Sequence, residues 1–174
     1  MPRTVPPFAD LLAGCKSTAL HLETRDVYGI PTEDADYAAW LGGASVDVTD
    51  RSKWWDTFHT TVSDAVARGV VVRRARVVSE PVSDYIRYEH ACTQRNIEAG
   101  EDVRWLPRSQ ASDLLLPGND YWIFDGQLVR FGLFAGDGRF VAHALEDAPH
   151  VVKQCSDAFQ AVWDRATPHA AYEI

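Results

Sequence analysis

The stretch that decides the fold, residues 70–85, reads "VVVRRARVVSEPVSDY". Its valines are typical of a buried β-strand, yet Arg73, Arg74 and Arg76 interrupt the apolar run. Because successive strand residues point to opposite faces of a sheet, Arg73 should point one way and the other two arginines the opposite way. The sequence therefore predicts an interior strand that holds charged groups on both faces.

Three arrangements can accommodate these arginines. An unpaired buried guanidinium is very costly, so each must reach solvent, pair with carboxylates or hold an anion. We favour an internal ion-pair lattice in which Arg74 and Arg76 pair with Glu23 and its neighbours. A small-ligand or phosphate site and a surface that docks a partner are the alternatives. The candidate carboxylates are Glu23, Asp26, Glu80, Asp84 and Glu89.

Hydrophobic periodicity and turn residues predict the other elements. Glycines at positions 43, 69 and 100 stand where helices should end, and the pairs Asp125-Gly126 and Asp137-Gly138 predict hairpin turns. In chain order we expect an extended arm (1–7), a short helix after it, a half-buried strand (18–26), a short helix (34–43), a helix (50–69), a strand (70–78), a helix (81–99), a strand (102–107), two hairpins (121–145), a helix (147–166) and a C-terminal tail (168–174).

Helices between the early strands favour parallel pairing, whereas tight hairpins require antiparallel pairing. We therefore expect a single α/β domain over residues 1–174, with a mixed parallel/antiparallel sheet and helices on both faces. Large aromatic residues such as Trp105, Tyr121 and Trp122 are expected to pack in its core.

Composition limits the classes of partner. The chain has 174 residues and a net charge of −8, which argues against direct nucleic-acid binding, although residues 68–108 carry eight Arg against six acidic residues. No apolar segment is long enough to suggest a membrane span. Three widely spaced cysteines without a C-x-x-C pair suggest reduced thiols. We expect a cytoplasmic protein.

The sequence contains no recognised catalytic or metal-binding motif. The six histidines lack metal-ligand spacing, and there is no glycine-rich phosphate loop or G-x-S-x-G elbow. We assign no catalytic residue, metal ligand or cofactor. Ligands of open α/β sheets bind at the carboxyl ends of the strands, and a helix N-terminus there favours anions. The ligand- or partner-binding candidates are Glu23, Arg25, Arg74, Arg76, Glu80, Asp84 and Arg87.

Two resemblances extend this interpretation. The segments "FADLLAGCKSTALHLETRDVY", "RARVVSEPVSDYIRYEH", "AGEDVRWLPRSQASDLLLPGNDYWIFD" and "VVKQCSDAFQAVWDRATPH" resemble an actinobacterial family commonly encoded beside helix-turn-helix regulators. That family has no established activity or assigned catalytic residues.

At the level of fold, "ARGVVVRRARVV", the strand ending "WIFD", the "LVRFGLF" and "GRFVAHALEDAPHVV" hairpin run and the final "FQAVWDRA" resemble a phospholipase-D-like half domain. Enzymes of that family depend on His-x-Lys-x-x-x-x-Asp, in which the His forms a phospho-enzyme. No His-x-Lys occurs in this chain. The resemblance therefore implies a catalytically silent version of the fold.

These observations favour a non-enzymatic, cytoplasmic regulatory module that acts with a protein partner, expected to be a helix-turn-helix transcription regulator. Sensing of a small anionic ligand near Arg76, Glu80 and Asp84 would be an additional role. The alternative is an enzyme for a phosphate ester or nucleotide, with Arg74, Arg76 and Arg87 as an anion clamp. A homodimer through an edge strand or the Trp-rich helix 51–68 stays open.

Overall fold

The computed structural model describes residues 4–29 and 34–174. Its helices and strands are α1 (Phe8–Gly14), β1 (Thr18–Glu23), α2 (Asp34–Leu41), α3 (Thr57–Ala67), β2 (Val71–Val78), α4 (Asp84–Ala99), β3 (Asp102–Pro107), β4 (Tyr121–Phe124), β5 (Leu128–Phe134), β6 (Phe140–Glu146), α5 (Pro149–Arg165) and β7 (Thr167–Pro168). Short 3₁₀ helices lie at Arg51–Lys53, Arg108–Ala111 and His169–Ala171.

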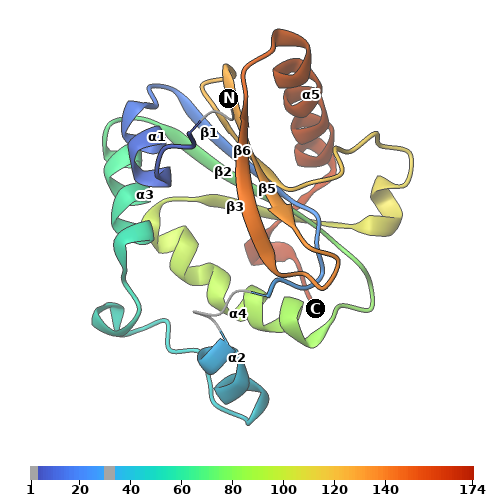
Figure 1. Ribbon diagram of the computed structural model, residues 1–174. Coiled ribbons are helices and arrows are strands. Elements are labelled where there is room, and N and C mark those ends of the chain that lie inside the picture. The colour runs from blue at the N-terminus through green and yellow to red at the C-terminus, as the bar shows by residue number, and fades with distance from the viewer. Residues whose placement is uncertain (1–3, 30–33) are drawn as a thin grey trace.

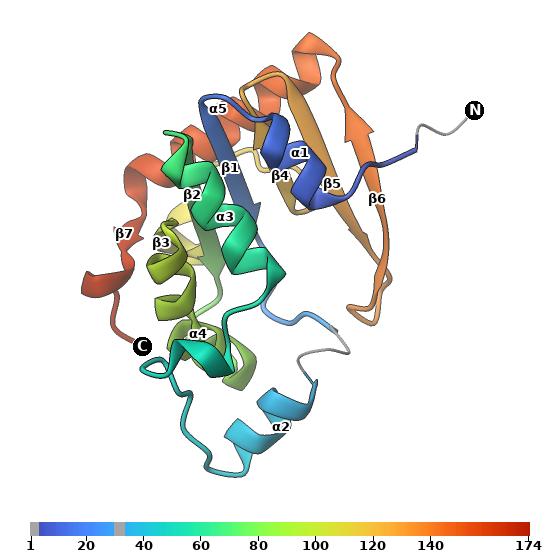
Figure 2. The same cartoon turned by 90° about the vertical axis from the view of Figure 1, so that its left-hand side faces the viewer.

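The strands form one seven-stranded sheet in the order β6-β5-β4-β1-β2-β3-β7. β1, β2 and β3 are parallel, and β4, β5, β6 and β7 each join antiparallel to a neighbour. Helix α5 covers one face of the sheet, and α1, α3 and α4 cover the other (Figures 1 and 2). The expected α/β domain with a mixed sheet and helices on both faces is confirmed.

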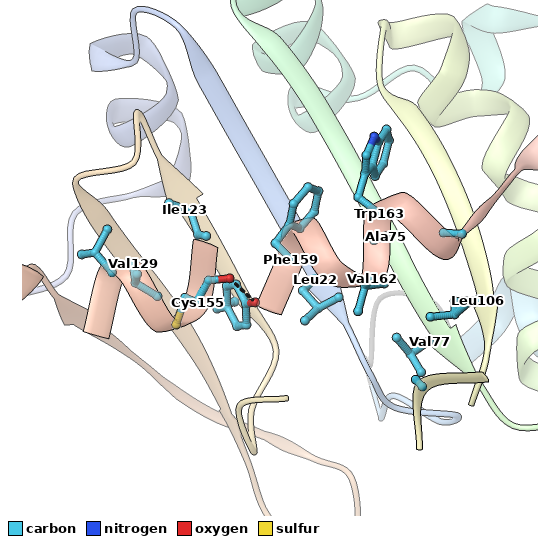
Figure 3. Close-up of a cluster of buried hydrophobic side chains, with 14 residues drawn as sticks. Leu22, Ala75, Val77, Leu106, Ile123, Val129, Cys155, Phe159, Val162 and Trp163 are labelled. Carbon is cyan, nitrogen blue, oxygen red and sulfur yellow. Dashed lines mark hydrogen bonds between the residues drawn. The ribbon is translucent and has the colours of Figure 1, made fainter. Parts of the chain in front are cut away.

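The α5 face holds the larger apolar core (Figure 3). Helix α5 turns a continuous apolar stripe toward the strands, and the Tyr121 hydroxyl donates a hydrogen bond of 2.8 Å to the carbonyl of Cys155. Arg73 lies on this face, with its guanidinium 5.0 Å from the ring centroid of Trp163. The fully or nearly buried members include Leu22, Ala75, Val77, Leu106, Ile123, Val129, Cys155, Phe159, Val162 and Trp163.

The opposite face holds two smaller apolar clusters with a polar zone between them. One lies under α1 and α3 and includes Leu12, Val62, Val72 and Phe124. The other lies under α4 and includes Val78, Tyr85, Ile86, Trp105 and Tyr172. The residues after α5 complete the second cluster, because the Tyr172 ring stacks on Trp105 at 5.6 Å between centroids.

Most predicted elements are confirmed, including both hairpins and the helix ends at Gly43, Gly69 and Gly100, where φ is positive. The prediction for the first strand needs correction. β1 ends at Glu23 rather than at residue 26. Helices cover both faces of the sheet on which it lies, and four of its six residues keep partial exposure. Its polar side therefore faces the protein interior.

Two helix starts were also predicted too early. The helix expected from residue 50 begins at Thr57, because Asp56 caps it by accepting the backbone N–H of His59 at 3.1 Å. The helix expected from residue 81 begins at Asp84, since Ser83 is its N-cap. Cys15 follows α1 as its C-cap residue, and its thiol donates to the Asp125 carboxylate.

Candidate functional site

Four polar side chains lie side by side in the middle of the sheet, on the face opposite α5. β1 contributes His21 and Glu23, and β2 contributes Arg74 and Arg76. In the parallel register His21 is the partner of Arg74, and Glu23 is the partner of Arg76. Alternate residues of adjacent strands share a face, so this register brings the four groups together.

Glu23 is the centre of an ion-pair network. Its Oε1 lies 3.0 Å from Arg74 Nη1 and its Oε2 lies 2.9 Å from Arg76 Nε. Only 8% and 5% of the Arg74 and Arg76 side chains are exposed, so both guanidiniums are interior charges. Arg76 Nη1 also pairs with Glu89 on α4. The predicted pairing of both arginines with Glu23 is confirmed.

Glu101 completes the network and was missed by the sequence analysis. Its carboxylate receives two hydrogen bonds from Arg74, at 2.8 Å from Nε and 3.1 Å from Nη2. Strand periodicity is the pattern that could have identified Glu101. Val103 is the register partner of Arg74, and Glu101 stands two residues earlier, hence on the same face.

The network fixes the charge states of its members. Burial alone would raise the pKa of Glu23, but the charges of Arg74 and Arg76 outweigh it and lower that pKa to about 2. Burial would likewise lower the pKa of both guanidiniums, and the facing carboxylates instead hold it above its ordinary value. All three groups therefore stay ionised at neutral pH.

A cavity of about 740 Å³ opens above this network. Glu23, Arg74, Arg76, His21 and Trp122 line its inner end, and one face of α4 forms a wall. The outer end is lined by α2 and by residues 44–47, 53, 54 and 56, so the site depends on segments that precede α3. Its aromatic lining residues include Trp40, Trp54, Phe58, Tyr85, Tyr88 and Trp122.

His21 is a neutral member of the cavity floor. Its ring stacks on that of Trp122, with centroids 4.2 Å apart and planes at 15°. Burial, reinforced by Arg74, Arg76 and Arg130 and opposed by Glu23, lowers the pKa of His21 to about 3. Cys92, on the α4 wall, has its pKa raised to about 11, chiefly by burial. At neutral pH these residues are an unprotonated imidazole and a protonated thiol.

The predicted site residues do not all meet. Glu23, Arg74 and Arg76 line the cavity, whereas the other four candidates do not. Arg25 lies over the ring of Phe134, 4.6 Å from its centroid. The Glu80 carboxylate accepts a hydrogen bond of 2.7 Å from the Tyr172 hydroxyl. Asp84 and Arg87 are exposed on the first turn of α4.

Arg108 fills the place where a crevice was expected, at the carboxyl ends of the parallel strands. Its Nε donates to Ser79 Oγ at 3.0 Å, and its Nη2 donates to the carbonyl of Val77 at 3.1 Å. The Asp26 carboxylate accepts the backbone N–H of Ser79 at 2.7 Å. These contacts link the carboxyl ends of the strands to one another. The cavity lies under α3 and α4 and not at these strand ends.

Metal-binding clusters and membrane-spanning helices are both absent from the described residues. No group of three or more His, Cys, Asp or Glu side chains there is placed to hold a metal ion. Within residues 4–29 and 34–174, no helix has both the length and the apolar character needed to cross a membrane.

Several solved structures have a similar fold. NucT from Helicobacter pylori aligns over 92% of this chain and 87% of its own, with 9% identity and a TM-score of 0.51. Nuc from Salmonella typhimurium, a phospholipase D family member, aligns over 92% and 86%, with 12% identity and a TM-score of 0.49. The archaeal chromatin protein TrmBL2 aligns over 91% of this chain and 48% of its own, with 15% identity and a TM-score of 0.48.

At these identities the similarity concerns the fold alone. No curated protein sequence is similar to this chain. Residues 6–173, nearly the whole of it, match a family described as a domain of unknown function, and the chain thus belongs to the DUF6879 family.

Proposed function

We propose that the domain is a non-enzymatic binding module that holds a small molecule in the cavity and acts with a protein partner. The observation that carries this proposal is the cavity itself, which has a fixed polar floor and aromatic walls. Cavities of several hundred Å³ that combine aromatic walls with a few placed polar groups are typical ligand sites.

The protonation states favour binding over catalysis. A general base works best with a pKa near the operating pH, and a cysteine nucleophile needs its thiolate. The pKa of His21 is lowered to about 3 and that of Cys92 is raised to about 11. Glu23 is ionised but held by two guanidiniums, so its basicity is low. The floor is suited to orienting a ligand.

The rival function, turnover of a phosphate ester with an arginine clamp, has less support. Arg74 and Arg76 already face three carboxylates, those of Glu23, Glu89 and Glu101. A phosphate would have to displace at least one of these at a large desolvation cost. Arg87, the third member of the expected clamp, is exposed outside the cavity.

The partner belongs to the proposal because of the family resemblance and the position of the cavity mouth. α2 and residues 44–47 line that mouth, and α2 projects from the body of the domain beside α4 (Figure 2). A ligand that contacts this segment would change a surface open to a partner. We propose a helix-turn-helix transcription regulator encoded near the gene as that partner.

A ligand screen tests the proposal. A compound at a hundred times its Kd stabilises the fold by about 2.7 kcal/mol, which is readily seen as a higher Tm. Ala39→Trp should obstruct the cavity mouth and weaken binding at least tenfold. Ala38→Trp, on the same helix but outside the cavity lining, should leave binding unchanged.

Co-purification with the neighbouring regulator, and a change in its operator binding on adding the hit compound, test the partner. The proposal fails if no compound raises the Tm and no regulator co-elutes. Arg76→Ala separates the rival function. If Arg76 only supports the fold, this variant should lose stability. If Arg76 belongs to an anion clamp, the wild type should turn over phosphate esters, and the variant should lose that activity while its stability stays unchanged.

A further inference from the structure

We infer that the outer part of the cavity is a subsite for an anionic oxygen group, a carboxylate or a phosphate, bound by Arg95 and Trp54. This inference rests on the proposed function, because it assumes that the cavity holds a small molecule. The sequence pattern predicted an anion beside the arginines of β2, whereas this subsite lies away from them.

Arg95 differs from the other cations that line the cavity. Lys53 lies 2.9 Å from a carboxylate oxygen of Asp47, and Arg74 and Arg76 are paired with Glu23. Within the described residues Arg95 has no carboxylate at ion-pair distance, and its Nη2 donates only to the backbone carbonyl of Asp47, at 3.1 Å. Its positive charge is therefore available to a ligand.

Two buried donors in this part of the cavity lack an acceptor. In the part of the chain that the structure describes, neither Trp54 Nε1 nor Arg95 Nε has a hydrogen-bond partner, although both atoms are buried. Trp54 is 8% exposed, and the Arg95 guanidinium lies 5.7 Å from the centroid of its ring. Leaving such buried donors unpaired costs free energy. A ligand atom that accepts a hydrogen bond from both would remove this cost, which favours an acceptor between them.

The residues around Arg95 can add contacts to a bound oxygen anion. Cys92, Arg95 and Asn96 lie three and four positions apart on α4, and all three line the cavity. The Asn96 amide can add a further hydrogen bond. A carboxylate or phosphate can accept from the guanidinium and from the indole N–H at once, and charge-assisted bonds of this kind are the stronger ones. A neutral carbonyl would leave the charge of Arg95 uncompensated.

The remaining walls define the rest of the ligand. Phe58, Tyr88 and Trp122 also line the cavity. Such walls favour a flat apolar body over a second charged group. The simplest probes are therefore benzoate and phenyl phosphate, with benzyl alcohol as the neutral counterpart that keeps the ring and lacks the anion.

Indole ¹⁵N–¹H NMR tests the inference directly, with Trp54→Phe identifying the Nε1 signal of Trp54. Benzoate or phenyl phosphate should shift this signal in the wild type, and benzyl alcohol should bind at least tenfold more weakly. The anion that binds with the lower Kd shows whether the subsite prefers a carboxylate or a phosphate. Arg95→Gln should weaken anion binding at least tenfold, and Arg95→Lys, which keeps the charge, should weaken it less. Arg87→Gln, an exposed arginine of the same helix, is the matched control.

Equal binding by the wild type and Arg95→Gln would overturn the subsite, even if the cavity binds ligands. Failure of both anions to bind the wild type, while neutral aromatic compounds do bind, would overturn it in the same way. If no compound of any class binds, the proposed function fails with it. These three results are distinguishable in one titration series.

Discussion

Glu101 holds Arg74 by a bidentate contact, with both of its carboxylate oxygens accepting from the same guanidinium at 2.8 and 3.1 Å. The pair joins β2 to the residue that precedes β3, and Glu101 is only 3% exposed. A second carboxylate, that of Glu23, joins the same guanidinium to β1. Three parallel strands are thus linked through one buried charge, which also forms part of the cavity floor.

Replacement of Glu101 by Ala should destabilise the fold strongly. The variant leaves Arg74 buried with half of its carboxylate partners, and loss of one partner of a buried pair typically costs about 3–5 kcal/mol. Urea denaturation measures the change. Glu98→Ala removes an exposed carboxylate from the last turn of α4 and should change the stability by less than about 0.5 kcal/mol. Similar effects of the two substitutions would contradict a buried network.

His21 should make the stability fall as the solution is acidified from about pH 6.5. Its pKa is lowered to about 3 in the folded protein, mainly by burial, whereas an unfolded histidine titrates near 6.5. Between these values the unfolded chain binds the proton and the native state does not, so acid favours unfolding. The loss should continue to about pH 3, at up to about 1.4 kcal/mol per pH unit.

Urea midpoints measured across this range test the role of His21. His21→Gln should lose less stability than the wild type between pH 6.5 and 3, because the glutamine has no proton to gain. His150→Gln, at an exposed position, should follow the wild type. Parallel curves for the wild type and His21→Gln would show that the imidazole is not held neutral.

Asp125 connects the first hairpin to the start of β1. Its carboxylate accepts the backbone N–H groups of Lys16, Ser17 and Thr18 at 2.9, 2.7 and 3.0 Å. Asp125→Asn should destabilise the protein by about 2 kcal/mol, because the charge-assisted acceptor is lost. Asparagine tolerates the positive φ of 53° at this position, so backbone strain adds little.

Asp137→Asn is the control for Asp125, since it changes an aspartate of the second hairpin turn that accepts one backbone N–H, that of Arg139, at 3.0 Å. Thermal unfolding should show a clear decrease in Tm for the first variant and a small one for the second. Equal decreases would mean that the network around residues 16–18 contributes little to stability.

The sequence was sufficient for the elements with strong periodicity. The valine run predicted β2, and the spacing of Val152, Cys155, Phe159 and Val162 predicted α5. It also predicted that Arg74 and Arg76 pair with Glu23, because buried guanidiniums require carboxylates. These inferences need only local patterns and the cost of burying a charge.

The cavity could not be predicted in the same way. It needs residues from α2 and from the irregular segment before α3, and no periodic pattern places such a segment in space. Asp50 and Asp56 are both good capping residues, and only tertiary packing selects Asp56 as the N-cap of α3. The outer subsite depends on that choice, since Trp54 would otherwise lie within a helix.

Cys92 provides a chemical probe of the cavity. Burial raises the pKa of all three cysteines to about 11, with Asp125 adding to the effect at Cys15, so differences in labelling rate report access rather than acidity. Cys15 and Cys155 are 4% and 2% exposed, whereas Cys92 is partly exposed and lines the cavity. Cys92 should therefore react first with a maleimide, on the order of 100-fold more slowly than a free thiol at neutral pH.

Labelling followed by mass spectrometry of peptides identifies the modified cysteine. Cys92→Ser should remove the first labelling event and leave the slow ones unchanged. A compound bound in the cavity should slow the reaction of Cys92 without affecting the other two thiols. First labelling at Cys15 or Cys155 would contradict an open cavity, because a reagent can reach those thiols only when the apolar cores around them open.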